Sequence, residues 1–155
     1  MKDAMTIASY ICRRYEAEQG ERIDEMKLHK LLYLAQRESL IRTGEALFDE
    51  DFYGWRFGPV LPQIRESYKN NDFQPITDEE LGCDKATLDA VFESYARKDS
   101  WSLSRLTHGE ICWKKSRKGI APNESSNNLI PLADIRLDAE RMKERREMLD
   151  PSSQL

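Results

Sequence analysis

Hydrophobic positions recur at helical spacing along most of the chain. From Asp3 to about Gln19 the apolar residues fall at intervals of three and four, and Gly20 follows at the position of a left-handed C-terminal cap. A second segment starts at Asp24, a good N-cap residue, carries a wide apolar face and stops at Gly44. Because so broad a face requires partners on several sides, we expect this second helix to be the centre of the domain.

The same spacing predicts four further helices. They are one from Gly58-Pro59 to the stretch NNDFQP, one capped by Asp84, a short one from about Ser102 to His108-Gly109, and one from Pro131 to about Leu149. The apolar seam of the last helix is narrow enough to pack on the domain or on a partner helix. The predicted fold class is therefore all-α, a compact single-domain helical bundle over residues 1–149 with a flexible tail, 150–155.

The stretch DEDFYGWRFGPVLPQIRESY, Asp49 to Tyr68, departs from this helical pattern. It is short and broken by glycines around residues 51–58, which leaves open a small β-hairpin there. Tyr, Trp and Arg are enriched at binding hot spots, and acids ahead of them would steer a basic surface. We therefore predict a protein-binding site, whose partner-binding residues are Asp49, Glu50, Asp51, Tyr53, Trp55 and Arg56. That Trp55 and Phe57 merely fill the space between helices stays an alternative.

Composition narrows the classes of function. Hydrophobic residues make up 39% and charged residues 34% of 155 residues, which is typical of one globular domain. The net charge of −4 disfavours nucleic acid as the partner, because non-specific binding depends on neutralising phosphates. We find neither a secretory signal nor a membrane span. The odd number of cysteines, without a CxxC pair, predicts reduced thiols in a cytoplasmic protein.

Candidate chemistry is sparse. His108 and Cys112 are spaced as two ligands on one helix face, but no second pair completes a zinc site, so we predict no metal and no cofactor. His108 beside Thr107 lacks a nucleophile-elbow pattern, and no glycine-rich phosphate loop is present, so we predict no catalytic residue and no enzyme; a hydrolase that uses His108 stays an alternative. The basic segment CWKKSRKG, which includes Trp113, leaves open a nucleic-acid-binding regulator that uses Lys114, Lys115, Arg117 and Lys118.

Two segments carry a resemblance to a known family. KLHKLLYLAQRESLIRTGEALFDEDFYGWRFGPVLPQIRESYK, residues 27–69, closely resembles the opening half of the Panacea domain, the SocA-like antitoxin family that is also met in phage-associated proteins. LSRLTHGEICW, residues 103–113, is similar to a second element of that family. The resemblance covers most of residues 5–115. Two positions depart from the pattern: Cys112 and Ala46 stand where proline is usual.

The resemblance implies an antitoxin of a type II toxin-antitoxin system, which binds and neutralises a protein toxin encoded beside it. It implies that the motif residues that form the scaffold are Lys30, Tyr33, Gln36, Phe57, Gly58, Pro59, Thr107, His108 and Trp113. A proteolytic adaptor that delivers the toxin to an energy-dependent protease is an alternative, with a protease or chaperone as a further partner. The oligomeric state stays open.

Overall fold

The structure is a computed structural model that describes residues 1–150. The flexible tail expected over 150–155 lies, beyond Asp150, outside the described residues. Residues 1–150 form eight helices and three short strands. They are α1 (Ala4–Gln19), α2 (Glu25–Thr43), β1 (Phe52–Trp55), β2 (Gly58–Val60), α3 (Pro62–Asn70), α4 (Asp78–Leu81), α5 (Asp84–Tyr95), α6 (Ser100–His108), α7 (Ile111–Ser116), β3 (Leu129–Ile130) and α8 (Leu132–Leu149). The prediction of a mostly α-helical fold with a short hairpin is confirmed.

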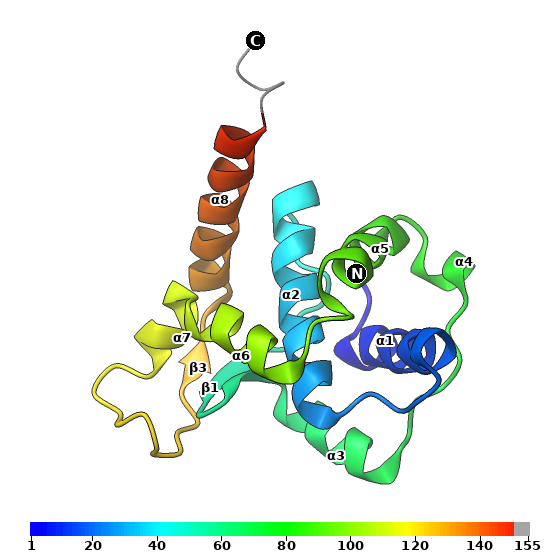
Figure 1. Ribbon diagram of the computed structural model, residues 1–155, viewed down its shortest axis with the longest axis horizontal. Coiled ribbons are helices and arrows are strands. Elements are labelled where there is room, and N and C mark those ends of the chain that lie inside the picture. Colours follow the sequence, from blue (N-terminus) through cyan, green and yellow to red (C-terminus); the bar gives the residue numbers. More distant parts are fainter. Residues whose placement is uncertain (151–155) are drawn as a thin grey trace.

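Helix α2 is the centre of the molecule, and the other long helices pack around it (Figure 1). Every residue from Lys27 to Leu40 is buried, which explains the wide apolar face in the sequence. The helix begins after Asp24, whose carboxylate accepts a hydrogen bond from the Lys27 backbone N–H at 2.8 Å, and ends at Gly44, which has a φ of 76°. Both predicted ends of this helix are therefore confirmed.

A three-stranded antiparallel sheet, in the order β2-β1-β3, lies at one end of α2 (Figure 1). Strands β1 and β2 pair Tyr53 with Val60 and Trp55 with Gly58, so a two-residue turn joins them. Strand β3 pairs with the other edge of β1, although it lies about 75 residues later in the chain. The sequence left open a hairpin here, and the structure confirms it; the sequence did not indicate β3, which is only two residues long.

The predicted start of the third helix, at Gly58-Pro59, is wrong. Helix α3 begins at Pro62, and Pro59 instead pairs with Gly54 in the edge strand β2. An edge strand tolerates proline because one side of its backbone is not needed for pairing. Pro59 and Pro62 both look like helix starts in the sequence, and only Pro62 occupies the first helical position.

Other helix ends differ by a few residues. Helix α6 begins at Ser100 because Asp99 caps it, accepting a hydrogen bond from the Ser102 N–H at 2.8 Å. Helix α5 starts at Asp84 itself, after Cys83. The short helices α4 and α7 were not predicted, since four and six residues are too few to show a helical period.

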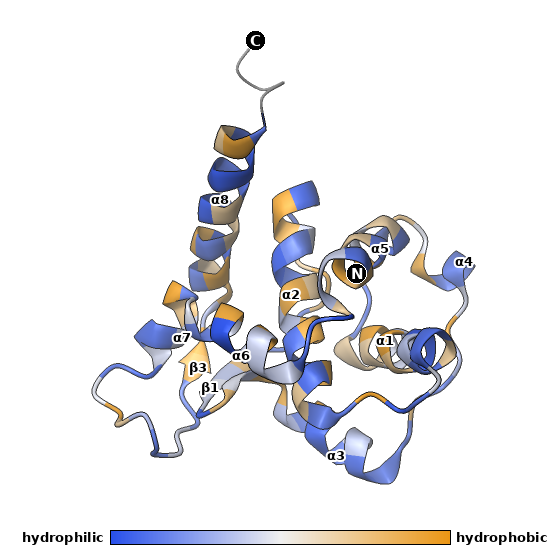
Figure 2. Cartoon of the chain, in the orientation of Figure 1, coloured by the Kyte–Doolittle hydropathy of each residue, from blue (hydrophilic) through white to orange (hydrophobic). Residues whose placement is uncertain are grey.

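Helix α8 runs beside the C-terminal half of α2 (Figure 1) and is mostly hydrophilic with interspersed hydrophobic residues (Figure 2). Ile135 and Ala139 of the predicted seam are buried, whereas Leu149 is 73% exposed. The Arg146 guanidinium binds both carboxylate oxygens of Glu38 on α2, at 2.9 and 2.8 Å. The first half of the seam therefore packs on the domain. None of the helices in residues 1–150 combines the length and the hydrophobicity of a membrane span.

Candidate functional site

One face of α2 fixes the course of the chain that follows the helix. Lys30, Tyr33 and Gln36 are three residues apart and so lie on neighbouring turns of the same side. The Gln36 side chain accepts a hydrogen bond from the Leu47 N–H at 2.7 Å and donates one to the Phe48 carbonyl oxygen at 2.9 Å. This motif therefore positions the connection between α2 and the hairpin.

Lys30 supports the hairpin turn from the inside of the molecule. It is 1% exposed, and its ammonium donates a hydrogen bond to the Phe57 carbonyl oxygen. Burial lowers the pKa of Lys30 to about 8, and the charge of Asp24 opposes that shift. Gly58 has a φ of 129°, and a Cβ atom there would lie 2.9 Å from Lys30 Nζ and 3.1 Å from Thr107 Oγ1. Glycine is required for the backbone conformation and for the close approach.

The second motif meets the hairpin from α6 and α7. The rings of His108 and Trp113 stack, with centroids 4.1 Å apart and planes 6° from parallel. Trp113 Nε1 donates a hydrogen bond to the Trp55 carbonyl oxygen at 2.8 Å. Burial, followed by the charge of Lys30, lowers the pKa of His108. The neutral His108 ring thus serves as a stacking surface that holds Trp113 against β1.

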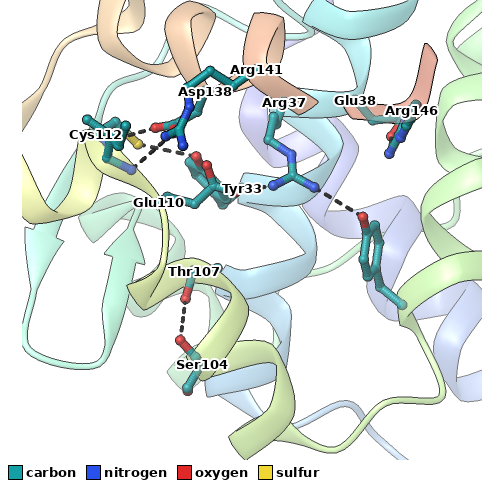
Figure 3. A network of polar contacts seen from close by, with 12 residues as sticks. Tyr33, Arg37, Glu38, Ser104, Thr107, Glu110, Cys112, Asp138, Arg141 and Arg146 are labelled. Atoms are coloured by element: carbon teal, nitrogen blue, oxygen red, sulfur yellow. Dashed lines mark hydrogen bonds and ion pairs between the residues drawn. The ribbon is translucent and has the colours of Figure 1, made fainter. Parts of the chain in front are cut away.

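A cluster of buried and half-buried polar side chains lies where α2, α5, α7 and α8 meet (Figure 3). Arg37 forms an ion pair with Glu110 and donates a hydrogen bond to the Tyr95 hydroxyl at 3.1 Å. Asp138 accepts two backbone N–H groups at the start of α7, at 3.0 and 2.7 Å. We call this cluster the polar network; it comprises Tyr33, Arg37, Tyr95, Glu110, Cys112 and Asp138.

The ionisation of the polar network follows from its burial. Desolvation raises the pKa of Glu110 to about 7, although Arg37 favours its ionised form, and the nearby charge of Asp138 adds to the rise. Burial also raises the pKa of the Cys112 thiol, whose sulfur lies 3.2 Å from the Tyr33 hydroxyl, so Cys112 is an unreactive structural thiol. One of the N–H groups bound by Asp138 belongs to Cys112, and the proline that the resemblance implies at this position could not make that bond.

An open groove of about 860 Å³ lies among the N-terminal half of α2, the hairpin turn, the start of α3 and residues 125–127. We call it the Trp55 groove. Its apolar lining comes from Met26, Trp55, Phe57, Val60 and Pro62. Trp55 is held in place because its Nε1 donates a hydrogen bond to Asn127 Oδ1 at 2.8 Å, whereas Phe57 at the turn is 45% exposed. The groove therefore presents aromatic surface outside the core.

Two arginines lie at the Trp55 groove. The Arg56 guanidinium is 4.9 Å from the centroid of the Phe57 ring, and the Arg65 guanidinium is 5.4 Å from that of Trp55. Both arginines are exposed, and neither forms an ion pair with any acid in the described part of the chain. Stacking on a ring limits the freedom of each side chain while leaving its N–H donors available.

The acid in the groove lining is already bonded. His29 Nδ1 accepts a hydrogen bond from the Leu61 N–H at 3.4 Å, which assigns the ring proton to Nε2, 3.2 Å from the Glu25 carboxylate. This bond is the main cause that lowers the pKa of Glu25, while burial lowers that of His29. Glu25 is therefore an anion whose hydrogen-bonding capacity is partly used within α2.

Five of the six predicted partner-binding residues lie in two places, and the sixth, Tyr53, is half-buried in β1. Trp55 and Arg56 line the Trp55 groove, and residues 49–51 line a separate cavity of about 60 Å³ beside the start of α8. Asp49 and Asp51 are exposed. Glu50 instead accepts the Ala4 N–H at 2.9 Å, which satisfies a backbone donor in the first turn of α1. Its role in this structure is to cap a helix.

Phe57 differs from the scaffold role expected of it. It occupies the two-residue turn between Trp55 and Gly58, where a side chain has no neighbour across the sheet, and it lines the groove. The other scaffold residues are buried or partly buried: Lys30, Tyr33, Gln36, Gly58, Pro59, Thr107, His108 and Trp113.

Arg117 is also not where the sequence pattern placed it. It is 6% exposed, and its guanidinium donates hydrogen bonds to three carbonyl oxygens and to the Ser126 hydroxyl, at 2.6 to 3.3 Å. Lys115 lies 3.3 Å from Asp134. The basic segment is therefore not a row of four phosphate-binding cations, because Arg117 instead holds residues 121–126 against β1.

The sequence did not indicate several residues of the groove. Arg65 is one turn into α3, and residues 125–127 come from a polar loop far along the chain. Met26, His29 and Lys30 have the spacing of one helix face, a signal that could have placed them together. The loop carried no such signal, since its position depends on the contacts of Arg117.

Two other kinds of chemistry weighed from the sequence were a metal site and Thr107 beside His108. Residues 1–150 contain no group of three or more His, Cys, Asp or Glu side chains placed to hold a metal ion. Thr107 is fully buried and donates its hydroxyl to the Ser104 carbonyl oxygen at 3.1 Å, within its own helix. The arrangement is suited to binding through aromatic and guanidinium groups.

Comparison with known proteins gives one match. Residues 28–114 match the family model described as antitoxin SocA-like, Panacea domain. No curated protein and no solved structure matches the chain. The matched range runs from α2 to α7 and includes the hairpin, so both motif segments that meet at Trp55, apart from Lys27, fall within it.

Proposed function

The chain belongs to the SocA-like Panacea antitoxin family, and we propose that it neutralises a protein toxin encoded by a neighbouring gene through direct, non-catalytic binding. The observation that carries the proposal is the family match over residues 28–114. An antitoxin of this kind requires affinity and a complementary surface, and needs no reaction centre. We propose that residues 1–149 act as one domain in the cytoplasm.

The Trp55 groove supports binding as the mode of action. Aromatic and arginine side chains are over-represented at the residues that dominate interface energies, and here Trp55, Phe57, Arg56 and Arg65 gather around one concave surface. A groove whose walls are fixed by hydrogen bonds loses little freedom when a partner enters. The proposed partner contacts are Tyr53, Trp55 and Arg56, with exposed Asp49 and Asp51 facing a basic patch of the toxin.

The geometry of the second motif supports a non-catalytic role. The hydroxyl of Thr107 and the thiol of Cys112 are buried and hydrogen bonded, and His108 stacks on Trp113. The stacked His108 and Trp113 rings support the hairpin, and Thr107 and Cys112 form their hydrogen bonds with neighbouring helices or their own helix, so these groups are used within the fold.

Co-expression tests the proposal. The neighbouring reading frame is induced alone and together with this chain, and we expect growth to stop in the first case and continue in the second. Purified proteins should then form a complex, and the antitoxin should act without any protease. If co-expression no longer rescues growth in a host that lacks its energy-dependent protease, the protein delivers the toxin to that protease and does not neutralise it by binding alone. A salt-dependent shift of operator DNA by the free protein would favour a regulator. Lethality unchanged by co-expression would refute the antitoxin function.

A further inference from the structure

The Trp55 groove has a charge character that the chain as a whole lacks. The chain carries a net charge of −4, yet the groove is lined by Arg56, Arg65 and Lys30 against a single acid, Glu25. The Glu25 carboxylate already accepts a hydrogen bond from His29 Nε2 at 3.2 Å. The groove is therefore locally positive, although the chain as a whole is negatively charged.

The two guanidinium groups are held ready for a ligand. Each lies over an aromatic ring of the groove, which limits the positions it samples. A guanidinium is weakly hydrated and presents N–H donors in a plane that fits the two oxygens of a carboxylate. Since neither Arg56 nor Arg65 has an ion-pair partner within residues 1–150, both are able to bind an external anion.

The surface between the arginines is apolar. Trp55, Phe57, Met26, Val60 and Pro62 line the groove, and 45% of Phe57 is exposed. Burying this surface would favour an aliphatic or aromatic side chain in the groove. The floor is rigid, because Lys30 binds the turn at the Phe57 carbonyl oxygen and Trp113 Nε1 binds β1 at 2.8 Å.

From these contacts we propose that the Trp55 groove binds a segment of the toxin in which carboxylates flank an apolar side chain. The apolar side chain enters between Trp55 and Phe57, and the carboxylates pair with Arg56 and Arg65. The inference rests on the proposed function, since it names the chemistry of the toxin segment that the antitoxin binds. It is distinct from steering by Asp49 and Asp51, which line another cavity.

The first test compares two double variants. R56E/R65E reverses both groove charges, and R13E/R97E reverses two exposed arginines of α1 and of the segment after α5, so the net charge falls equally in both. The affinity for the purified neighbouring-gene product is measured by titration calorimetry at fixed salt. We expect R56E/R65E to weaken binding about 30-fold or more, the size of a hot-spot loss, and R13E/R97E to change it less than about threefold. Equal affinities of the two variants would overturn the groove proposal and leave the antitoxin function standing.

A second test does not need the toxin. The probe is an acetylated, amidated peptide that alternates Glu and Leu, and its control has Gln in place of every Glu. NMR follows the indole N–H of Trp55, assigned with Trp55→Phe, with the exposed Trp101 as the internal reference. We expect the Glu peptide to shift the Trp55 signal saturably, about tenfold more tightly than the Gln peptide, and not in R56E/R65E. Equal binding of both peptides, no shift at millimolar peptide, or self-association of the protein through this groove would overturn the proposal.

Discussion

Helix α2 takes part in two regions that use charge in opposite ways. In the polar network, Arg37 is 3% exposed and paired with Glu110. In the Trp55 groove, two turns nearer the start of the helix, Arg56 and Arg65 are exposed and unpaired within the described chain. Buried charges must be paired because desolvation is costly, whereas exposed unpaired charges are available to a partner. The comparison predicts that changes in the network reduce stability and that changes in the groove reduce binding.

The largest effect on stability is expected from Arg37→Met. It leaves the Glu110 carboxylate buried without its counter-charge, so we expect the free energy of unfolding at pH 8 to fall by about 3 to 5 kcal/mol. Urea denaturation measures it. R37M/E110Q should recover much of the loss, because neither buried charge then remains. If Arg37→Met alone were as stable as the wild type, the polar network would not contribute to stability in the way the comparison predicts.

Gly58→Ala tests the part of the fold between the polar network and the Trp55 groove. Gly58 lies against Lys30 at the base of the hairpin turn. The φ of 129° and the 2.9 Å approach to Lys30 Nζ predict a loss of about 2 to 3 kcal/mol in the free energy of unfolding. Gly20→Ala is the matched control: its φ is 75° with nothing within 4 Å, so about 1 kcal/mol is expected. Thermal unfolding of both variants gives the comparison, and equal losses would show that the contact with Lys30 is unimportant.

The ionisation of Glu110 makes a smaller, pH-dependent contribution. Its pKa is raised from 4.5 to about 7 in the folded chain, so the folded state binds the proton more tightly than the unfolded state. The associated stability is fully present below pH 4.5 and is lost as the pH rises through about 7. We expect the wild type to lose about 1 to 2 kcal/mol relative to Glu110→Gln between pH 6 and pH 8. Parallel denaturation curves for the two proteins at all pH values would contradict the raised pKa.

The smallest effect on stability is expected from D49K/D51K. Both side chains are exposed, so the free energy of unfolding should change by less than about 0.5 kcal/mol. If these acids steer a basic patch of the toxin, stopped-flow association at low salt should slow by about three- to tenfold. Glu50 is left unchanged because it caps α1. Identical association rates would remove the acids from the binding surface.

The sequence predicted the helices with clear periods and clear caps. Asp24 and Gly44 mark the ends of α2 in the sequence as they do in the structure, because capping is a local interaction. Pro59 was misassigned because its local signal is the same in an edge strand and in a first helical turn. Short elements such as β3 depend on partners distant in the chain, which local patterns do not identify.

The candidate site was predicted less completely. Trp55 and Arg56 were identified because their residue types are typical of interfaces, and both line the groove. Arg65 and residues 125–127 were missed because only folding brings them to the hairpin. Arg117 had the composition of a phosphate contact, and only its burial revealed that it binds backbone carbonyl groups.

The way in which Arg117 holds one wall of the groove has an evolutionary consequence. Within residues 121–126 Arg117 binds the main-chain oxygens of Ala121 and Glu124 and one side chain, that of Ser126, so these contacts depend on only one of the loop's side chains. Exposed loop positions such as Asn123 and Ser125 are then free to mutate without loss of the loop's shape. Substitutions at these positions could therefore change the binding specificity of the groove during evolution, while Arg117 maintains the conformation of the loop.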